Sequence, residues 1–144
     1  MNYLSLQKPP QPKWLWLLLA AILLIAWARM ARAEEINDNS AVRAIIGEAS
    51  NQGYNGMLAI AAGIRNRGTL QGVYGLKAKH IDKEPRWIWD MARKAWQESK
   101  HNRIHIGYMW ENIKAFGKPS WLKNMILVYQ YKDHNFYKAK GGEK

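Results

Sequence analysis

The chain has 144 residues, a formal net charge of +11 and no cysteine. Its length suits a single domain. Without cysteine the protein has no disulfide bond, no thiol nucleophile and no zinc site of the cysteine type, so its fold depends on an apolar core alone. Eight tryptophans, five of them after residue 33, supply large side chains for such a core.

The first 33 residues have the pattern of an export segment. Residues 14–28 form an uncharged apolar run of 15 residues behind two lysines, and residues 31–33 match the A-x-A pattern of a cleavage site. A stable span of a bilayer needs about 20 residues, so the run is short for a transmembrane helix. Two alternatives follow: residues 1–33 are a cleaved signal peptide, or residues 14–28 remain as a membrane anchor. Both predict an exported protein of the periplasm or cell envelope.

Charge and export together limit the partners. Loss of residues 1–33 would remove four basic residues and no acid, which changes the net charge from +11 to +7. A positive field attracts anionic polymers, and an exported protein meets the acidic cell envelope rather than nucleic acid. The four histidines show no H-E-x-x-H spacing, so we expect no zinc site and no other cofactor. The sequence indicates no oligomeric state.

The rest of the chain predicts helices first and strands last. After a lead-in over 34–40, apolar residues recur at helical spacing in three segments, and two β-prone runs follow a glycine-punctuated loop. The expected helices cover 41–51, 55–66 and 85–99, and the β-prone runs cover 104–110 and 126–131. These elements predict an α+β fold, mainly helical, with a small C-terminal β-hairpin or sheet and a cleft between the two parts.

Particular residues mark the ends of these helices. Gly53 is expected to take a positive φ after the first helix, and Gly68 is expected to end the second. Pro85 suits the first turn of the third helix. Asp82 and Glu84 precede it and are expected to cap it.

Glu48 is the residue with the most definite chemical potential. It lies at the flank of the apolar stripe of the first helix, one turn beyond Ala44 and two turns beyond Ala41, whose small side chains leave space beside the carboxylate. A carboxyl group among apolar neighbours favours its neutral form and can protonate a leaving oxygen at neutral pH. The alternative is a surface charge on the edge of an amphipathic helix.

Several motifs follow one another along the chain around this glutamate. They are AIIGEA at 44–49, GYNG at 53–56, AIAAGIRNR at 59–67, PSW at 119–121 and DHNFY at 133–137. Over about residues 41–138 this pattern resembles the SleB/CwlJ-type cell-wall hydrolase family, which leaves 139–144 as a flexible tail. Two features depart from the family pattern: Asn51 replaces a glycine of the family's turn, and the family's histidine is missing from 109–112.

The resemblance implies a lysozyme-like catalytic domain. It implies cleavage of the β-1,4 bond between N-acetylmuramic acid and N-acetylglucosamine in peptidoglycan glycan strands, and it makes Glu48 the acid/base of a lytic transglycosylase. Such an enzyme needs one carboxyl group, because the C6 hydroxyl of the sugar replaces water and closes a 1,6-anhydro ring. Two alternatives remain: a muramidase that uses Glu48 with Glu111, and a non-catalytic, exported basic module that binds the cell wall.

Other residues are candidates for binding or orienting the substrate. They are Tyr54, Asn66, Trp110, Asn112, Trp121, His134 and Tyr137. The two tryptophans suit stacking against a pyranose ring and equally suit the core. Asn66 is expected either to bond a loop backbone or to orient Glu48, and Arg67 is expected to pair with an acid.

Overall fold

The computed structural model describes residues 36–141, which belong to the second of the two units Met1–Glu35 and Ile36–Lys144. The export segment predicted over 1–33 lies outside the described residues. Within the described part, no helix combines the length and the apolar character that crossing a membrane requires. The predicted α+β class, mainly helical with a small C-terminal sheet, is confirmed.

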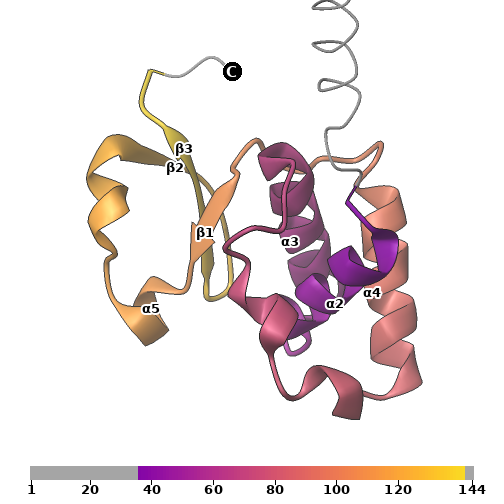
Figure 1. Ribbon diagram of the computed structural model, residues 1–144. Coiled ribbons are helices and arrows are strands. Elements are labelled where there is room, and N and C mark those ends of the chain that lie inside the picture. The colour runs from indigo at the N-terminus through magenta and orange to yellow at the C-terminus, as the bar shows by residue number, and fades with distance from the viewer. Residues whose placement is uncertain (1–35, 142–144) are drawn as a thin grey trace, which may run out of the picture. The chain divides into compact units, whose positions relative to one another are not determined.

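Three long helices of the described region pack against one another (Figure 1): α2 (Asp38–Ala49), α3 (Gly53–Arg67) and α4 (Arg86–Glu98). Asn37 caps α2 by accepting a hydrogen bond from the backbone N–H of Ser40 at 3.1 Å. Gly53 has a φ of 74° between α2 and α3, and Gly68 ends α3 with a φ of 75°, as predicted.

The core of this unit lies between the three helices. Every residue of α3 from Gly56 to Ile64 is buried, in agreement with its almost continuous apolar sequence. The largest side chains with no exposed surface include Ile45, Ile60 and Ile64, and Trp96 of α4 is nearly as buried. Helix α2 is therefore packed on several sides, which fixes the direction in which its last turn presents Glu48.

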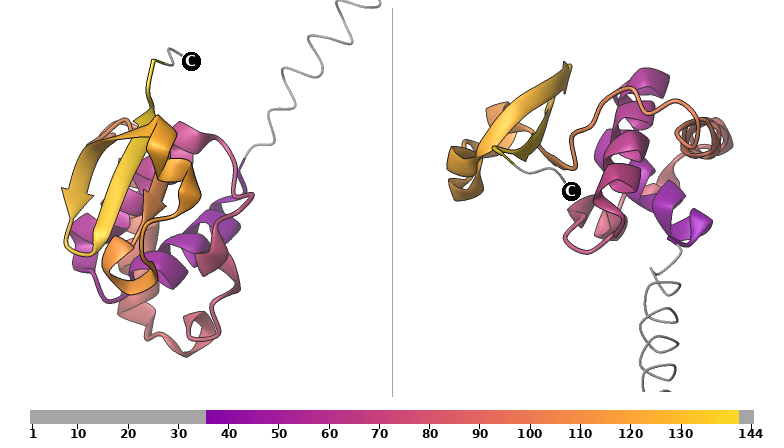
Figure 2. Two further views of the ribbon diagram at one scale, coloured as in Figure 1. Left: turned by 90° about the vertical axis from the view of Figure 1, so that its left-hand side faces the viewer. Right: turned by 90° about the horizontal axis from the view of Figure 1, so that it is seen from above.

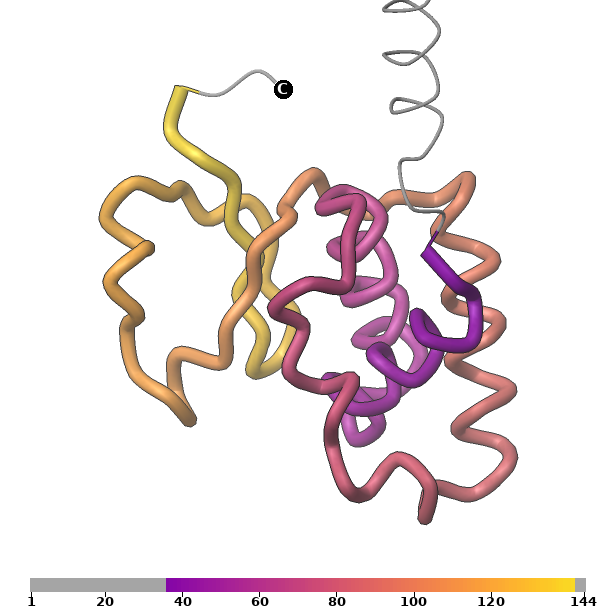
Figure 3. Tube along the Cα trace, in the orientation of Figure 1, coloured from indigo at the N-terminus to yellow at the C-terminus, as the bar shows by residue number. Residues whose placement is uncertain are grey.

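The connection from α3 to α4 contains two short 3₁₀ helices, η1 (Tyr74–Lys77) and η2 (Ile81–Lys83). Helix η1 packs directly on the end of α2, and Figure 3 shows the chain passing beside α2 there. This approach requires glycine, because a Cβ on Gly47 would lie 1.8 Å from the carbonyl oxygen of Gly75. The backbone of η1 is thereby brought next to Glu48.

The predicted cap of α4 is wrong. The residue before α4 is Pro85, and no side chain caps the helix. Asp82 instead forms an ion pair with Arg43 of α2 at 2.6 Å, and Glu84 lies 4.0 Å from the ring nitrogen of His80. Asp82 is therefore bonded to Arg43, and neither carboxylate accepts a hydrogen bond from the first N–H groups of α4.

The C-terminal part is a three-stranded antiparallel sheet of order β1-β3-β2, made of β1 (Met109–Glu111), β2 (Met125–Tyr131) and β3 (His134–Ala139). Short helices α5 (Ile113–Phe116) and η3 (Ser120–Asn124) connect β1 to β2. The β-prone run predicted over 104–110 pairs only at its end, because the Asn66 side chain binds the carbonyl oxygens of His105 and Gly107.

The sheet packs beside α3, and the right view of Figure 2 shows it as a separate layer from the helices. Gly63 of α3 permits the contact, since a Cβ there would lie 3.1 Å from the Trp110 ring. Phe136 of β3 fills the interface and has no exposed surface. The end of α2, η1, β1 and the β2–β3 turn thus surround a common space.

Candidate active site

An open pocket of about 1070 Å³ lies between the helices and the sheet. Its walls come from the end of α2, the η1 loop, β1, α5 and the β2–β3 turn. Six of the nine residues predicted for the site line it: Glu48, Trp110, Glu111, Asn112, Trp121 and His134. The fold therefore gathers residues that are up to 86 positions apart in the sequence.

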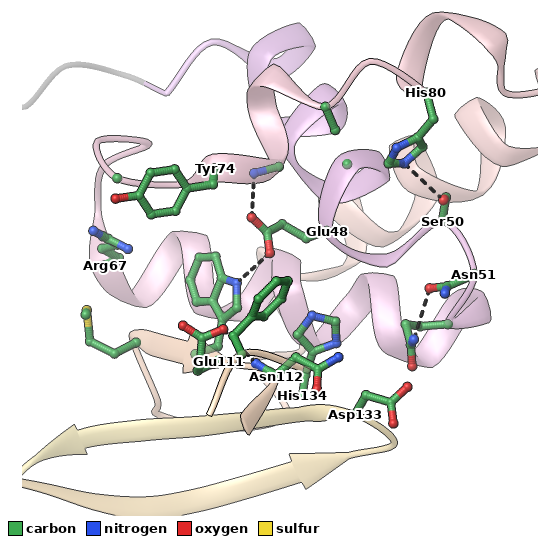
Figure 4. Close-up of a pocket in the computed structure, with 18 of the residues that line it drawn as sticks. Glu48, Ser50, Asn51, Arg67, Tyr74, His80, Glu111, Asn112, Asp133 and His134 are labelled. Atoms are coloured by element: carbon green, nitrogen blue, oxygen red, sulfur yellow. Dashed lines mark hydrogen bonds between the residues drawn. The ribbon is translucent and has the colours of Figure 1, made fainter. Parts of the chain in front are cut away.

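Glu48 is held from two directions. Its Oε1 accepts a hydrogen bond of 2.6 Å from the backbone N–H of Gly75, and its Oε2 accepts one of 3.1 Å from the indole N–H of Trp110 (Figure 4). One donor comes from the helical part and the other from the sheet. Two of the about four acceptor positions of a carboxylate are used, so others remain for a ligand or a proton. The side chain is half-buried, with its orientation fixed by both walls.

Glu111 lines the same pocket at the end of β1. One of its oxygens, Oε1, accepts the backbone N–H of Asn112 at 3.0 Å, while no hydrogen bond from the described residues reaches Oε2. The Asn112 side chain in turn caps α5 by accepting the N–H of Ala115 at 2.9 Å. A second carboxylate is therefore present in the pocket, and Asn112 shapes the wall that carries it.

Aromatic residues surround the pocket. Trp110 and Trp121 belong to its lining, as predicted, and so do two residues that the sequence did not single out, Tyr74 and Phe116. Tyr74 is 86% exposed and Phe116 is 79% exposed, which is unusual for large apolar side chains. No local pattern reveals their place, because they belong to two short helices, η1 and α5, whose side chains meet at the pocket only after folding.

Two largely buried polar side chains in the pocket have atoms that form no hydrogen bond with the described residues. His134 is only 9% exposed, yet its ring nitrogens have no hydrogen bond to any described residue. Gln52 is 5% exposed; its amide nitrogen donates to Asn51, while its Oε1 has no partner in the described part of the chain. The buried Oε1 of Gln52 therefore carries a desolvation cost that a bound ligand or water removes. Gln52 was missed by the sequence analysis.

Burial lowers the pKa of His134, which favours its neutral form at neutral pH. Three carboxylates oppose this shift through their negative charge: Glu48, Asp133 and Glu111. These acids therefore lie close enough to act electrostatically on one imidazole. His134 is in consequence a neutral hydrogen-bonding group inside an acidic part of the pocket.

Three predicted residues lie outside the pocket lining. The Tyr54 hydroxyl donates to the Glu98 carboxylate of α4, and burial together with this bond raises the pKa of Tyr54 to about 12. Asn66 bonds the loop backbone, which was one of its two predicted roles, and does not contact Glu48. Tyr137 is buried in the sheet with its ring edge against Trp121, and burial raises its pKa.

The prediction made for Arg67 is wrong. This arginine was predicted to pair with an acid, but no carboxylate within the described range 36–141 lies at ion-pair distance from it, and it lines the pocket. Its guanidinium carbon lies 5.9 Å from the centre of the Trp110 ring. The pocket thus contains a cation in addition to its acids.

The described residues include no group of three or more histidine, aspartate or glutamate side chains arranged to hold a metal ion. No protein-family model, no curated protein and no solved structure matches the chain.

Proposed function

We propose that this protein cleaves the glycan strands of peptidoglycan at the β-1,4 bond between N-acetylmuramic acid and N-acetylglucosamine, as a lytic transglycosylase with Glu48 as its acid/base. One observation carries the proposal. Glu48 is held by two N–H donors from opposite walls of a large pocket that also contains aromatic rings and unpartnered buried polar groups. The motif resemblance of residues 41–138 supports it.

The size and lining of the pocket suit part of a polysaccharide. Its volume of about 1070 Å³ is slightly above the range of about 300–1,000 Å³ for small-molecule sites, and it is open, as a polymer requires. Sugars present C–H faces to aromatic rings and hydroxyl or acetamido groups to polar side chains. Tyr74, Phe116 and Trp121 offer the rings. Gln52 offers an unpartnered buried oxygen, and His134 offers ring nitrogens that bond no described residue.

The proposed reaction uses one carboxyl group twice. Protonated Glu48 gives its proton to the glycosidic oxygen as the bond from that oxygen to C1 of muramic acid breaks. The resulting carboxylate then takes the proton of the C6 hydroxyl, whose oxygen bonds to C1 and closes the 1,6-anhydro ring. The hydrogen bonds from Gly75 and Trp110 keep the carboxylate in place through both steps.

Glu111 supports a second candidate function, a muramidase. It lines the same pocket as Glu48 and has an oxygen without a partner among the described residues. A carboxylate in this position would activate a water molecule, or stabilise the positive charge on C1, in an ordinary glycosidase. The proposed location is the periplasm or cell envelope in both cases, because the substrate is found there.

The proposal is tested with Glu48→Gln, which keeps the shape of the side chain but cannot supply a proton. We expect the release of muropeptides from purified sacculi to fall about 100- to 10,000-fold, while the variant still sediments with the sacculi. Asp90→Asn, an exposed acid of α4 outside the pocket lining, is the matched control and should release muropeptides at the wild-type rate. Undiminished release by Glu48→Gln would reject the assignment. Sedimentation without release by the wild-type protein would favour the non-catalytic wall-binding module.

A further inference from the structure

The arginines of the described region differ in how their guanidinium groups are satisfied. Arg43 pairs with Asp82 at 2.6 Å, and Arg86 and Arg93 lie beside Asp90. Arg65 donates to the hydroxyl oxygen of Ser99 at 2.6 Å and to the carbonyl oxygen of Trp96 at 2.8 Å. Arg67, in the last turn of the same helix, is also partly buried, yet none of its N–H donors has an acceptor among residues 36–141.

The Arg67 guanidinium is held in the pocket by packing rather than by hydrogen bonds. Its carbon lies 5.9 Å from the centre of the Trp110 ring, and a Cβ on Gly72 would lie 2.9 Å from its Nη2. Gly72 has a φ of 75°, so this turn both favours glycine and leaves room for the arginine. Trp110 in turn binds Glu48. The cation is therefore positioned one aromatic ring away from the proposed acid/base.

The pocket lining contains a single basic side chain of the arginine or lysine type together with several acids. Arg67 is this basic side chain, while three acids are present: Glu48, Glu111 and Asp133. Figure 4 shows Arg67 beside Tyr74 on one side of Glu48, and Asp133 with Asn51 on the other. Glu111 lies on the same side of Glu48 as Arg67 in this view, so an anionic group on a bound ligand is attracted to the Arg67 guanidinium itself and repelled by Asp133 at the other end.

We propose that Arg67 binds a carboxylate carried by the glycan substrate, and that this contact selects acidic strands and sets their direction across Glu48. The inference rests on the proposed function. A planar guanidinium with free N–H donors matches a carboxylate in a two-bond geometry. Peptidoglycan offers this chemistry in two places, the lactyl group of muramic acid where no peptide is attached and the free carboxylates of the stem peptide.

The test measures binding without turnover, in Glu48→Gln protein. The ligands are a peptide-free tetrasaccharide of alternating N-acetylglucosamine and N-acetylmuramic acid, the same tetrasaccharide with its carboxylates converted to amides, and neutral chitotetraose. We expect Arg67→Gln to weaken binding of the acidic tetrasaccharide about 10- to 100-fold and to leave both neutral ligands unchanged. Arg67→Lys keeps the positive charge but lacks the planar guanidinium group, so it should bind the acidic tetrasaccharide more tightly than Arg67→Gln and less tightly than the parent protein.

Arg103→Gln is the matched control, since Arg103 is exposed and is not part of the pocket lining. It should bind all three ligands as the parent protein does. A fourth ligand, a peptide-bearing muropeptide with free or amidated carboxylates, separates the two sources. If Arg67→Gln weakens binding of this ligand alone, Arg67 contacts the stem peptide. If Arg67→Gln weakens binding of the peptide-free tetrasaccharide, Arg67 contacts the lactyl group.

Equal loss of affinity for acidic and neutral ligands in Arg67→Gln would overturn the inference, and so would binding of every ligand at the parent affinity. Release of muropeptides by the wild-type protein is measured in parallel. If release is normal while Arg67→Gln shows no selective loss, the role of Arg67 is rejected and the proposed function stands. If the wild-type protein releases nothing and binds none of the saccharides, both fail together.

Discussion

The helices on one side of the pocket and the sheet on the other bury their apolar side chains to very different extents. Helix α3 alone buries nine consecutive residues, and α2 adds six. In the sheet, Phe136 and Tyr137 are the buried apolar residues of β3, and every residue of β2 is at least partly exposed. The stability of this unit therefore resides mainly in the helices.

The helical part and the sheet part supply different groups to the pocket. Glu48 belongs to the well-packed part, which fixes its backbone, and η1 of the same part supplies the Gly75 N–H. The sheet part supplies Trp110, Glu111 and His134, and α5 adds the exposed ring of Phe116. A well-packed element thus carries the proposed acid/base, while a less deeply packed surface carries the residues proposed for recognition. The following predictions test this division.

The largest effect is expected in the helical core. Ile60 of α3 has no exposed surface, so Ile60→Ala should lower the free energy of unfolding by about 2–5 kcal/mol. Leu127 of β2 is 53% exposed, so Leu127→Ala should change it by about 0.5 kcal/mol or less. Urea unfolding followed by circular dichroism measures both values. Similar losses in the two variants would show that the sheet contributes as much stability as the helices.

A smaller effect is expected where the two parts meet at Glu48. Trp110→Phe keeps an aromatic ring against α3 but removes the N–H that binds Oε2. We expect the initial rate of muropeptide release to fall about 10-fold, because a hydrogen bond to a charged group is lost. Trp89→Phe, on α4 and outside the pocket lining, is the control and should leave the rate unchanged. An unaltered rate in Trp110→Phe would mean that the sheet does not help to position Glu48.

The smallest effect concerns the bond between α3 and α4. The pKa of Tyr54 is raised from 10.0 to about 12 in the folded protein. At a pH between these two values, the unfolded chain loses the phenol proton of Tyr54 and the folded chain keeps it. Stability should therefore fall as the pH rises from 10 to 12. Tyr54→Phe removes this contribution, so its Tm should approach that of the wild type over this range, with muropeptide release unchanged at neutral pH. A Tm difference that stays constant up to pH 12 would contradict the assignment.

Local patterns in the sequence were sufficient to predict the three long helices of the described region but not the short helix α5. The helix predicted over 41–51 corresponds to Asp38–Ala49, and the helix predicted over 85–99 corresponds to Arg86–Glu98. Their apolar periodicity and the glycines at positions 53 and 68 are information contained within a few turns. The first strand was predicted too long, because the Asn66 side chain, about 40 positions away, competes for the carbonyl groups of 105–107.

The residues that line the pocket were predicted only in part, because many of their contacts join positions far apart in the sequence. Glu48 was recognised from its helix and its motif, but its partner Gly75 contributes a backbone N–H and is 27 positions away. Tyr54 belongs to a predicted motif, yet its hydroxyl is committed to Glu98, 44 positions away. Tyr74 and Phe116 carry no local pattern at all. Contacts between residues far apart in the sequence determine which polar and aromatic side chains line the pocket.

The central claim is that one carboxyl group, Glu48, both gives and takes the proton. The most direct test is the mass of the products that the wild-type protein releases from purified sacculi in isotopically labelled water. We predict muropeptides with 1,6-anhydro ends, each one water lighter than a reducing end and free of the label. Reducing ends that contain oxygen from the labelled water would contradict the claim and would assign Glu111 a part in hydrolysis.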